Sequence, residues 1–412
     1  MTQIKLSPMN PERTNMNANR KEVLTDVSSL TCLIALFLFS TAGYILNPYF
    51  AIIVAEDLGH GIAFAGLLIS IKVVTQRLFS LLGGIGADVF GSYQMMQFGV
   101  MLRIISFLLL AFSLSHLYLI VATVLNGIGS ACFNPAIRKT LFTKYKNNEA
   151  KLQIVISLRS ALFNVGTAIG PLIGMLFIRS NFMIVCFIIA ALHLIVSVGL
   201  FLIKREEPLT NKKEHGFVKT SLLIFDRQLL PLYLLQFCFI YFYSNLEYLI
   251  PIYFSKISGT QLVGFAFFVN AVVVVSIQVF FVKWLANIKV RSSIAAFMVF
   301  FLLMFSIQFI DTPYNLIFIS LLAIFVFSFA EAALAYKTDY LATKISDASG
   351  AVYGALTMVG GLAFIVANLI NGLLQGVMSF QYVWGANAIL SIVVIAILLI
   401  FFNLKTGSKP TI

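Results

Sequence analysis

The chain has 412 residues, of which 60% are hydrophobic and only 11% are charged, and its formal net charge is +12. A soluble domain carries roughly 25% charged residues, so the composition excludes an ordinary water-soluble protein and indicates a membrane protein. The positions of the cations account for the basic balance, which therefore gives no support to nucleic-acid binding.

Twelve apolar runs are long enough to cross a membrane as helices. A hydrocarbon layer about 30 Å thick needs about 20 apolar helical residues. The predicted spans are 28–54, 62–86, 95–115, 117–137, 153–178, 182–203, 229–254, 261–285, 293–311, 314–337, 350–376 and 381–403. The first run is too long for the apolar core of a signal peptide, so no cleavage is expected.

The distribution of Lys and Arg predicts the orientation of the spans. With both termini in the cytoplasm, 22 cations fall on the inner side, and two, Arg179 and Lys256, fall on the outer side. Lys and Arg collect in cytoplasmic loops. Both termini are therefore expected to be cytoplasmic.

A polar stretch divides the chain into two halves. Residues 204–227, KREEPLTNKKEHGFVKTSLLIFDR, form the longest charged interruption and predict a cytoplasmic linker. The linker separates a six-helix bundle over 27–203 from a second bundle over 228–403, with cytoplasmic tails at 1–26 and 404–412. Two six-helix repeats are typical of secondary transporters, whose substrate site lies between the halves near the bilayer midplane.

Glycines and one acid interrupt the apolar pattern between spans two and three. Gly84 and its neighbours let helices approach closely, and Gly91 permits a tight reversal into span three. Asp88 falls at the inner surface, where a carboxylate interacts favourably with a helix N-terminus. Residues 347–350, DASG, supply N-cap residues before span eleven. We expect Asp88 to contact that helix when the cytoplasmic side closes.

Residues 84–91, GIGADVFG, resemble the signature between helices two and three of the major facilitator superfamily. The wider run 75–103 is similar to bacterial multidrug exporters of that superfamily and to their siderophore-exporting relatives. Residues 126–138 and 157–174 extend the likeness, the second to the helix-five motif of proton-coupled antiporters. The resemblance implies an all-α membrane protein with the major facilitator fold, in which twelve helices form two six-helix bundles, in the bacterial cytoplasmic membrane.

The likeness to the signature is incomplete. Val89, Ser92 and Tyr93 stand where the family normally has basic residues beside and after the second glycine. We therefore expect the gate at Asp88 to be held less tightly than in typical members.

The helix-five motif predicts a second gating element. Gly166, Gly170 and Gly174 recur every four residues and form one smooth face, and Pro171 favours a bend. Such a helix is expected to rock against a partner, with tight static packing as the alternative. Arg159 lies at the start of the motif and is assigned to the same gating region.

Few ionisable residues fall within the spans, and each costs about 2.5 to 3.5 kcal/mol there. The cations are Lys72, Arg77, Arg103 and Arg159 in the first half, and the acids are Glu247 and Glu331 in the second half. Two interpretations stay open: an acid pairs with a first-half cation across the central cleft, or Lys72 and Arg77 receive an anionic or zwitterionic substrate. The absence of a carboxylate in the first six spans disfavours a purely cationic drug.

The acids are the candidates for proton coupling, Glu247 first and Glu331 second, because a carboxyl group whose surroundings alternate takes up and releases a proton. Arg103 and Arg159 lie in the inner thirds of their spans, so a structural alternative for each is a long side chain that extends to the cytoplasm. The uncharged candidates for substrate contact are Asn47, Asn164, Asn245 and Asn270, each of which alternatively bonds a neighbouring helix.

These observations predict a monomeric, proton-driven exporter of a small amphipathic compound, either a carboxylated or siderophore-like metabolite or a drug. A broad multidrug efflux pump and a nutrient importer on the same fold are the alternatives. An enzyme is disfavoured because the spans contain no metal-ligand pair, nucleophile–base spacing or phosphate loop. No cofactor or metal is expected. The expected partners are the substrate, protons and the lipid bilayer, without nucleic acid.

Overall fold

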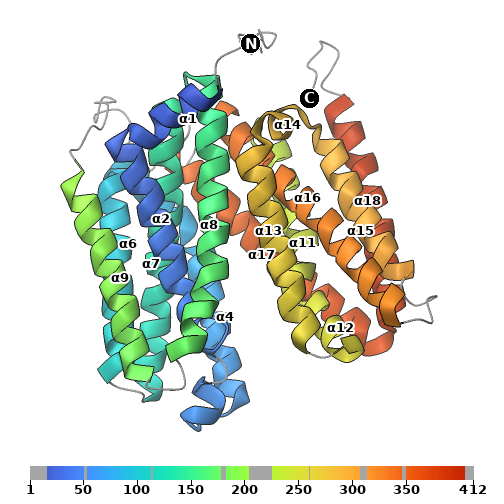
Figure 1. Cartoon of the computed structure of the whole chain (residues 1–412), viewed down its shortest axis with the longest axis horizontal. Helices are drawn as coiled ribbons and strands as arrows, with labels where there is room; N and C mark the ends of the chain where they lie inside the picture. The colour runs from blue at the N-terminus through green and yellow to red at the C-terminus, as the bar shows by residue number, and fades with distance from the viewer. Residues whose placement is uncertain are drawn as a thin grey trace.

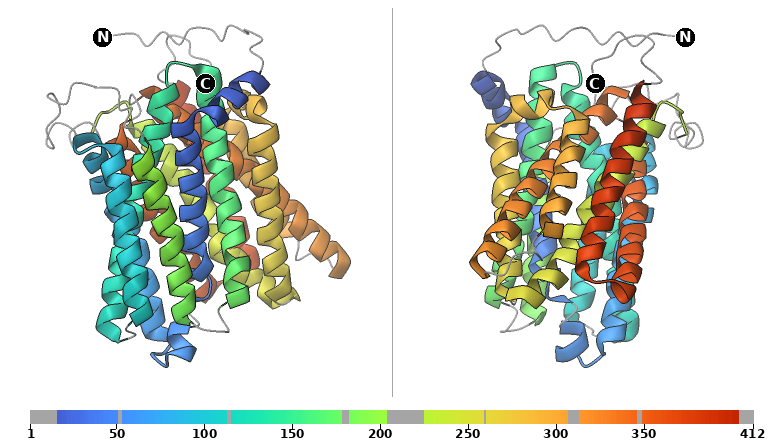
Figure 2. Two further views of the ribbon diagram at one scale, coloured as in Figure 1. Left: turned by 60° about the vertical axis from the view of Figure 1, so that its left-hand side comes forward. Right: turned by 90° about the vertical axis from the view of Figure 1, so that its right-hand side faces the viewer.

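The computed structural model describes residues 16–50, 53–112, 115–177, 182–203, 225–258, 260–306, 313–345 and 349–403. All regular secondary structure in these ranges is helical. Figures 1 and 2 show the helices running side by side in two groups, α1 to α9 in one and α11 to α18 in the other. Most of the predicted tails and linker, at 1–15, 204–224 and 404–412, lies outside the described residues.

The first group begins with a short helix that precedes the long ones. Its elements are α1 (Met16–Thr25), α2 (Val27–Leu46), the π-helix η1 (Ile53–Asp57), α4 (Ile62–Leu78), α5 (Ser80–Val89), α6 (Ser92–Phe112), α7 (His116–Tyr145), α8 (Glu149–Phe177) and α9 (Phe182–Leu202). Helix α1 lies at the same end of the molecule as the end of α18 (Figure 1).

The second group contains two helices that are interrupted. Its elements are α11 (Leu230–Glu247), α12 (Leu249–Ser258), α13 (Thr260–Phe280), α14 (Val282–Asn287), α15 (Val290–Ser306), α16 (Pro313–Ile345), α17 (Gly350–Val377) and α18 (Phe380–Asn403). Pro251 accounts for the break after α11, because its ring clashes with the carbonyl four residues earlier, which belongs to Glu247. The break therefore leaves Glu247 at a helix end.

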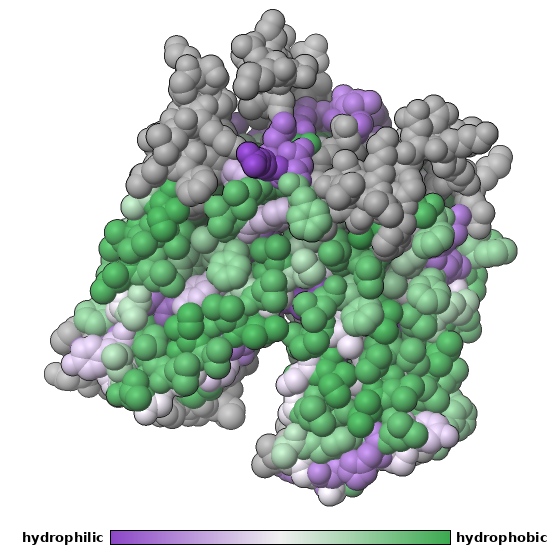
Figure 3. All heavy atoms as spheres, turned by 180° about the vertical axis from the view of Figure 1, so that it is seen from behind, coloured by the Kyte–Doolittle hydropathy of each residue, from purple (hydrophilic) through white to green (hydrophobic). Residues whose placement is uncertain are grey.

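Long apolar helices dominate both groups. Eight spans among the described residues are long and apolar enough to cross a membrane, and three shorter apolar stretches lie at Phe265–Phe280, Ser292–Ser306 and Phe380–Val394. Hydrophobic residues cover most of the outer face seen in Figure 3. In lipid, helices satisfy their own backbone hydrogen bonds. The chain is a multi-pass membrane protein, while twelve spans and cytoplasmic termini remain predictions.

The glycine face of α8 packs against α2, inside the first group. A Cβ atom at Gly170 would lie 2.7 Å from the carbonyl oxygen of Thr41, and one at Gly166 would overlap Ser40. Tyr49 donates a hydrogen bond to the carbonyl of Pro171, and Gly174 lies against Ile45. The partner of the smooth face is therefore α2, in the same group of helices. Rocking of α8 against this partner stays a prediction, with static packing as the alternative.

Three buried asparagines join helices of the second group. The Asn371 amide donates to the Asn245 carbonyl oxygen at 3.3 Å, and the Asn387 amide donates to the Asn371 carbonyl oxygen at 3.0 Å. Asn245 is fully buried, so it is not accessible to a substrate in this conformation. Asn245 therefore fits the alternative interpretation, in which its amide forms a hydrogen bond with a neighbouring helix.

Candidate functional site

A cleft separates the two groups at one end of the molecule. Figure 3 shows it open at the lower end, the end at which α12 lies in Figure 1. Toward the α1 end the groups are in contact, because α17 packs against α4, α5 and α7, and α8 packs against α13, α14 and α16. We call the α1 end the closed end. The molecule is therefore open on one side only.

Asp88 binds the N-terminus of α17 at the closed end. Its two carboxylate oxygens accept the backbone N–H groups of Gly350 and Ala351, both at 2.8 Å, and the Ser349 hydroxyl at 2.6 Å. These N–H groups have no partner within their own helix. The contact between Asp88 and the start of span eleven, predicted from the sequence, is confirmed.

A lysine from another helix supplies the cation beside Asp88. The ammonium of Lys139, on α7, lies 3.1 Å from Asp88 and also donates to the Ala87 carbonyl oxygen at 2.7 Å. Lys139 was not predicted, because it lies on α7, far along the sequence from the glycine signature. Gly91 has a φ of 103°, the conformation that the predicted reversal into α6 requires.

Glycines bring the two groups into backbone contact beside Asp88. A Cβ at Gly84 would overlap the carbonyl oxygen of Gly350, and one at Gly354 would overlap that of Ser80. The Ser80 hydroxyl donates to the Gly354 carbonyl oxygen at 2.9 Å. The smooth surface between the two groups is thus formed by α5 and α17.

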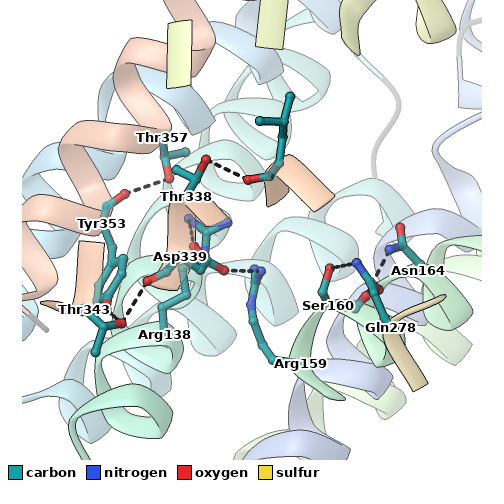
Figure 4. A network of polar contacts seen from close by, with 11 residues as sticks. Arg138, Arg159, Ser160, Asn164, Gln278, Thr338, Asp339, Thr343, Tyr353 and Thr357 are labelled. Atoms are coloured by element: carbon teal, nitrogen blue, oxygen red, sulfur yellow. Dashed lines mark hydrogen bonds and ion pairs between the residues drawn. The ribbon is translucent and has the colours of Figure 1, made fainter. Parts of the chain in front are cut away.

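A buried acid, Asp339, pairs with two arginines of the other group (Figure 4). The Arg159 guanidinium donates to Asp339 at 3.3 Å, and the Arg138 guanidinium lies 3.8 Å from the second carboxylate oxygen. Arg159 is 7% exposed, so the structural alternative, a side chain that extends to the cytoplasm, does not describe it in this conformation. Asp339 was missed because the predicted span ended at residue 337, whereas α16 continues to Ile345.

Further polar contacts cross the closed end. Glu149 on α8 accepts hydrogen bonds from Tyr340 and Lys344 on α16. The Gln278 amide donates to the Ser160 hydroxyl at 2.7 Å. The Arg20 guanidinium on α1 lies 3.5 Å from the Val279 carbonyl oxygen, next to the break between α13 and α14. Together with Asp88 and Asp339, these contacts hold the two groups together at one end.

The N-terminus of α2 is held within the first group. Asp26 caps α2 by accepting the Ser29 N–H at 2.8 Å, and it pairs with Lys144 at 2.6 Å. Burial acts to raise the pKa of Asp26, but the hydrogen bonds from Lys144 and Ser29 outweigh it and lower the pKa. The short helix α1 precedes this cap and makes a second contact with the first group through the ion pair of Glu22 with Lys151.

The two predicted proton-coupling acids occupy different surroundings. Glu331, on α16, is 7% exposed and accepts the Asn270 amide of α13 at 2.8 Å. Asn270 therefore positions Glu331 in this conformation and is not free for a substrate. Glu247 is exposed, and the Tyr243 hydroxyl donates to it at 3.3 Å. One acid is thus enclosed and the other accessible.

Arg77 faces the second group without an acidic partner. Its guanidinium carbon lies 5.9 Å from the centre of the Phe364 ring, and its stem lies against Gly361 of α17. Glu247 is close enough to interact with it electrostatically. Among the described residues no carboxylate comes within 4 Å of Arg77 or Lys72, so the predicted ion pair across the cleft is not formed in this conformation.

Lys72 lines a small pocket inside the first group, and Arg103 lies beside Gly43, another of its lining residues. The pocket also includes Asn47, Asn126 and Thr123. Lys72 donates to the side-chain oxygen of Asn47. Arg103 is 4% exposed and packs against the Phe39 ring, so the alternative that it extends to the cytoplasm does not describe it in this conformation. The direction of a side chain around a uniformly apolar helix is not encoded in the local sequence.

Asn164 lies on α8, a few residues along the helix from Ser160, which takes part in the contacts at the closed end. Its amide donates to the Ser160 carbonyl oxygen at 3.1 Å, within its own helix, as Figure 4 shows. Its side chain is half-buried. The predicted contact with substrate stays a prediction for this residue, as it does for Asn47, which is exposed at the end of α2.

Adding one methyl group at Gly84 is expected to hinder closure of the closed end. Gly84→Ala places a Cβ against the Gly350 backbone, and overpacking of this kind costs about 1 to 3 kcal/mol. Gly86→Ala is the matched control, because its Cβ meets only the flexible Met95 side chain of the same group. Thr338 is 4% exposed. A thiol reagent added on the side of the closed end labels Thr338→Cys only when that end opens, so the extent of labelling measures opening of the closed end. Equal labelling in both variants would contradict the expectation.

Comparison with known proteins agrees with this architecture. The chain is 29% identical over 160 residues to the multidrug resistance protein MdtH of Aeromonas hydrophila subsp. hydrophila, covering 39% of this chain and 40% of that protein. It is 27% identical over 277 residues to the uncharacterized MFS-type transporter YqjV of Bacillus subtilis (strain 168), covering 61% of this chain and 66% of that protein. The chain thus matches less than two thirds of either relative.

A solved structure shares the fold. The crystal structure of the human organic anion transporter MFSD10 has a TM-score of 0.71 and 18% sequence identity, with 92% of this chain and 99% of that chain covered. The family model of the Major Facilitator Superfamily matches residues 32–368. Because that match extends over most of the sequence, the chain belongs to the major facilitator superfamily, whose members carry small molecules across membranes.

Proposed function

We propose that this protein is a secondary active exporter that uses proton antiport to move a small amphipathic compound carrying a carboxylate. The bundles at 27–203 and 228–403, joined by the linker 204–227, alternate access to a site between them. Both termini face the cytoplasm of a bacterium, twelve spans cross its cytoplasmic membrane, and the protein works as a monomer. In this assignment the closed end is cytoplasmic, so the conformation faces outward.

The separation of charge carries the substrate assignment. Lys72, Arg77 and Arg103 lie within the first group without a carboxylate within 4 Å among the described residues, while Glu331 and Glu247 belong to the second. An unpaired cation in a membrane is costly, and a carboxylated substrate offsets that cost. Lys72 and Arg77, with Asn47 and Asn164, are the proposed substrate contacts, and the two acids are the proposed proton carriers.

The gate is proposed at the closed end. Asp88 with α17, the glycines at the α5–α17 contact, and Arg159 with Asp339 join the two groups through hydrogen bonds or direct backbone packing. Each of these contacts lies between groups that must separate for a substrate to enter from the cytoplasm. Their breaking and re-forming would constitute the inward-opening step.

A broad multidrug pump is the second candidate, supported by the relatives called multidrug resistance protein MdtH. Two experiments separate the candidates. Comparison of small molecules in the medium of cells with and without the protein identifies the exported compound. Everted vesicles with an imposed proton gradient then measure its direction: the proposal predicts accumulation that a protonophore abolishes. Accumulation in right-side-out vesicles alone would indicate an importer, and equal export of unrelated cations would indicate a multidrug pump.

A further inference from the structure

A cavity of about 390 Å³ lies between the two groups of helices at the closed end. Its lining includes Met16 and Arg20 of α1, Ile154 and Leu158 of α8, and residues 278–284 around the break between α13 and α14. Helices α1 and α14 lie at the same end of the molecule (Figure 1). Small-molecule sites in proteins have volumes of about 300 to 1,000 Å³. The cavity is therefore large enough to hold the headgroup of a phospholipid.

The cavity lies where apolar helix gives way to polar residues. The apolar stretch of α13 ends at Phe280, and the polar helix α1 precedes the apolar span that begins at Val27. Phe280 is 75% exposed and Phe281 is 56% exposed, so both rings face outward beside the cavity. Trp284 also lines the cavity and is partly exposed. Tryptophan collects at the boundary between lipid and water, so the cavity lies at the level of the lipid headgroups.

Two cations line the cavity, one from each group of helices. Arg20 is half-buried on α1, and Lys283 is exposed on α14. Neither forms an ion pair with another described residue. The contact of the Arg20 guanidinium with the Val279 carbonyl oxygen uses one of its five N–H donors. Among the described residues that line the cavity there is no Asp or Glu, so the cavity attracts an anion.

An anionic phospholipid matches both the charged and the apolar residues. Its phosphate would accept hydrogen bonds from Arg20 and Lys283, because arginine binds phosphate oxygens through paired N–H donors. Its acyl chains would cover the exposed rings of Phe280 and Phe281, which a soluble phosphate would leave uncovered. Basic pockets between transmembrane helices bind the headgroups of anionic lipids. The combination of cations and exposed rings therefore favours a lipid over a soluble anion.

We propose that this cavity binds an anionic phospholipid such as phosphatidylglycerol, with Arg20 and Lys283 as the ligands of its phosphate. The inference goes beyond the proposed function, because it concerns neither the transported compound nor the proton. Since the two ligands belong to different groups of helices, the site is complete only while the closed end is closed. The bound lipid therefore stabilises the closed end, because a ligand shifts a conformational equilibrium toward the state that it binds better.

Tryptophan fluorescence measures this binding directly, because the chain has only two tryptophans. Trp284 lines the cavity, whereas Trp384 is fully buried. The full-length Trp384→Phe variant, in which Trp284 is the sole tryptophan, is placed in lipid nanodiscs that contain brominated phosphatidylglycerol or brominated phosphatidylcholine. Bromine quenches tryptophan on contact. Phosphatidylglycerol is expected to bind beside Trp284 at least about tenfold more strongly than phosphatidylcholine, which corresponds to about 1.4 kcal/mol. If Trp384→Phe does not fold, the wild-type protein gives the comparison.

Removal of one cation should reduce this preference. Arg20→Gln and Lys283→Gln are each expected to lower it about fivefold, since one Lys or Arg near the membrane surface contributes about 1 kcal/mol of attraction to anionic lipid. Lys21→Gln and Lys289→Gln are the matched controls, because each removes a nearby exposed cation that does not line the cavity. An equal loss in all four variants would indicate diffuse attraction to the membrane surface and would overturn the site. Equal quenching by the two lipids in the parent protein would overturn it as well.

A soluble anion is the alternative occupant. Glycerol 3-phosphate, which carries a phosphate without acyl chains, is added in large excess over the protein. It should leave the quenching by brominated phosphatidylglycerol unchanged, because it does not cover the rings beside the cavity. If it removes the quenching, the phosphate alone is recognised and the assignment to a lipid is wrong.

The effect of the lipid on the closed end is measured with Thr338→Cys. Labelling of this cysteine should be about fivefold slower in nanodiscs with phosphatidylglycerol than in phosphatidylcholine alone, because opening removes one of the two cations from the lipid. Replacement of Arg20 and Lys283 by Gln together should abolish the difference. A difference that persists in this double variant would contradict stabilisation through the cavity.

The outcomes are independent of the proposed function, because none of these measurements involves transport. Loss of the lipid preference would remove the lipid site and leave the proposed exporter standing. Export of a compound without a carboxylate, or transport without proton coupling, would overturn the proposed function, whereas quenching that depends on Arg20 and Lys283 would still establish the lipid site.

Discussion

Replacing Glu331 with Gln is expected to uncouple transport from the proton gradient. Glu331 is 7% exposed and accepts a hydrogen bond from Asn270 in this conformation. Glutamine keeps the shape and an oxygen that accepts from Asn270, but it cannot ionise. Uphill accumulation in everted vesicles should fall more than about tenfold, which corresponds to a free energy of about 1.4 kcal/mol. Downhill exchange of labelled for unlabelled substrate should persist.

Glu247→Gln is expected to produce the same uncoupling, with its effect sensitive to external pH. Glu247 is exposed, so with the proposed orientation we expect it to exchange protons with the outer solution, whereas Glu331 is enclosed. Glu56→Gln is the matched control, because Glu56 is exposed on η1 and forms no side-chain hydrogen bond or ion pair with a described residue of the second group. If both acid variants retain proton-driven accumulation, the carrier of the proton lies elsewhere.

Local signals account for the parts of the site that the sequence predicts. Asp88 follows a glycine-rich turn, and Ser349 precedes a helix start; each pattern involves a few neighbouring residues. Both features are therefore readable without the fold. The π-helix and the helix breaks at Phe79, Tyr248 and Phe281 were not predicted, since an apolar run specifies helix in lipid but not its interruptions.

Long-range pairings account for what the sequence did not predict. Asp339 and Arg159 are 180 positions apart, and their contact depends on how the two bundles meet. The alternative that Arg103 extends to the cytoplasm followed from its depth alone, but the direction of its side chain depends on how α6 packs against α7 and α9. Asn245 and Asn270 were candidates for substrate contact for the same reason. An amide in an apolar helix forms a hydrogen bond either with a neighbouring helix or with a substrate.

Asp88→Asn is expected to open the cytoplasmic side. The carboxylate accepts two backbone N–H groups and one hydroxyl, and Asn replaces one acceptor oxygen with an NH2 group that faces donors. Hydrogen bonds to a charged group contribute about 1.5 to 3 kcal/mol each. Loss of one shifts the equilibrium toward the inward-open state by at least about tenfold. Labelling of a cysteine at Thr338 should rise accordingly, and export should fall.

Asp26→Asn provides the matched control for loss of a capping carboxylate. Asp26 also accepts a backbone N–H at a helix N-terminus and pairs with a lysine, but its partners Ser29 and Lys144 belong to the same bundle. It should destabilise the first bundle slightly without raising the labelling at Thr338. If Asp88→Asn and Asp26→Asn raise labelling equally, the effect is a general loss of stability, and the contact of Asp88 with α17 is not what holds the two bundles together at the closed end.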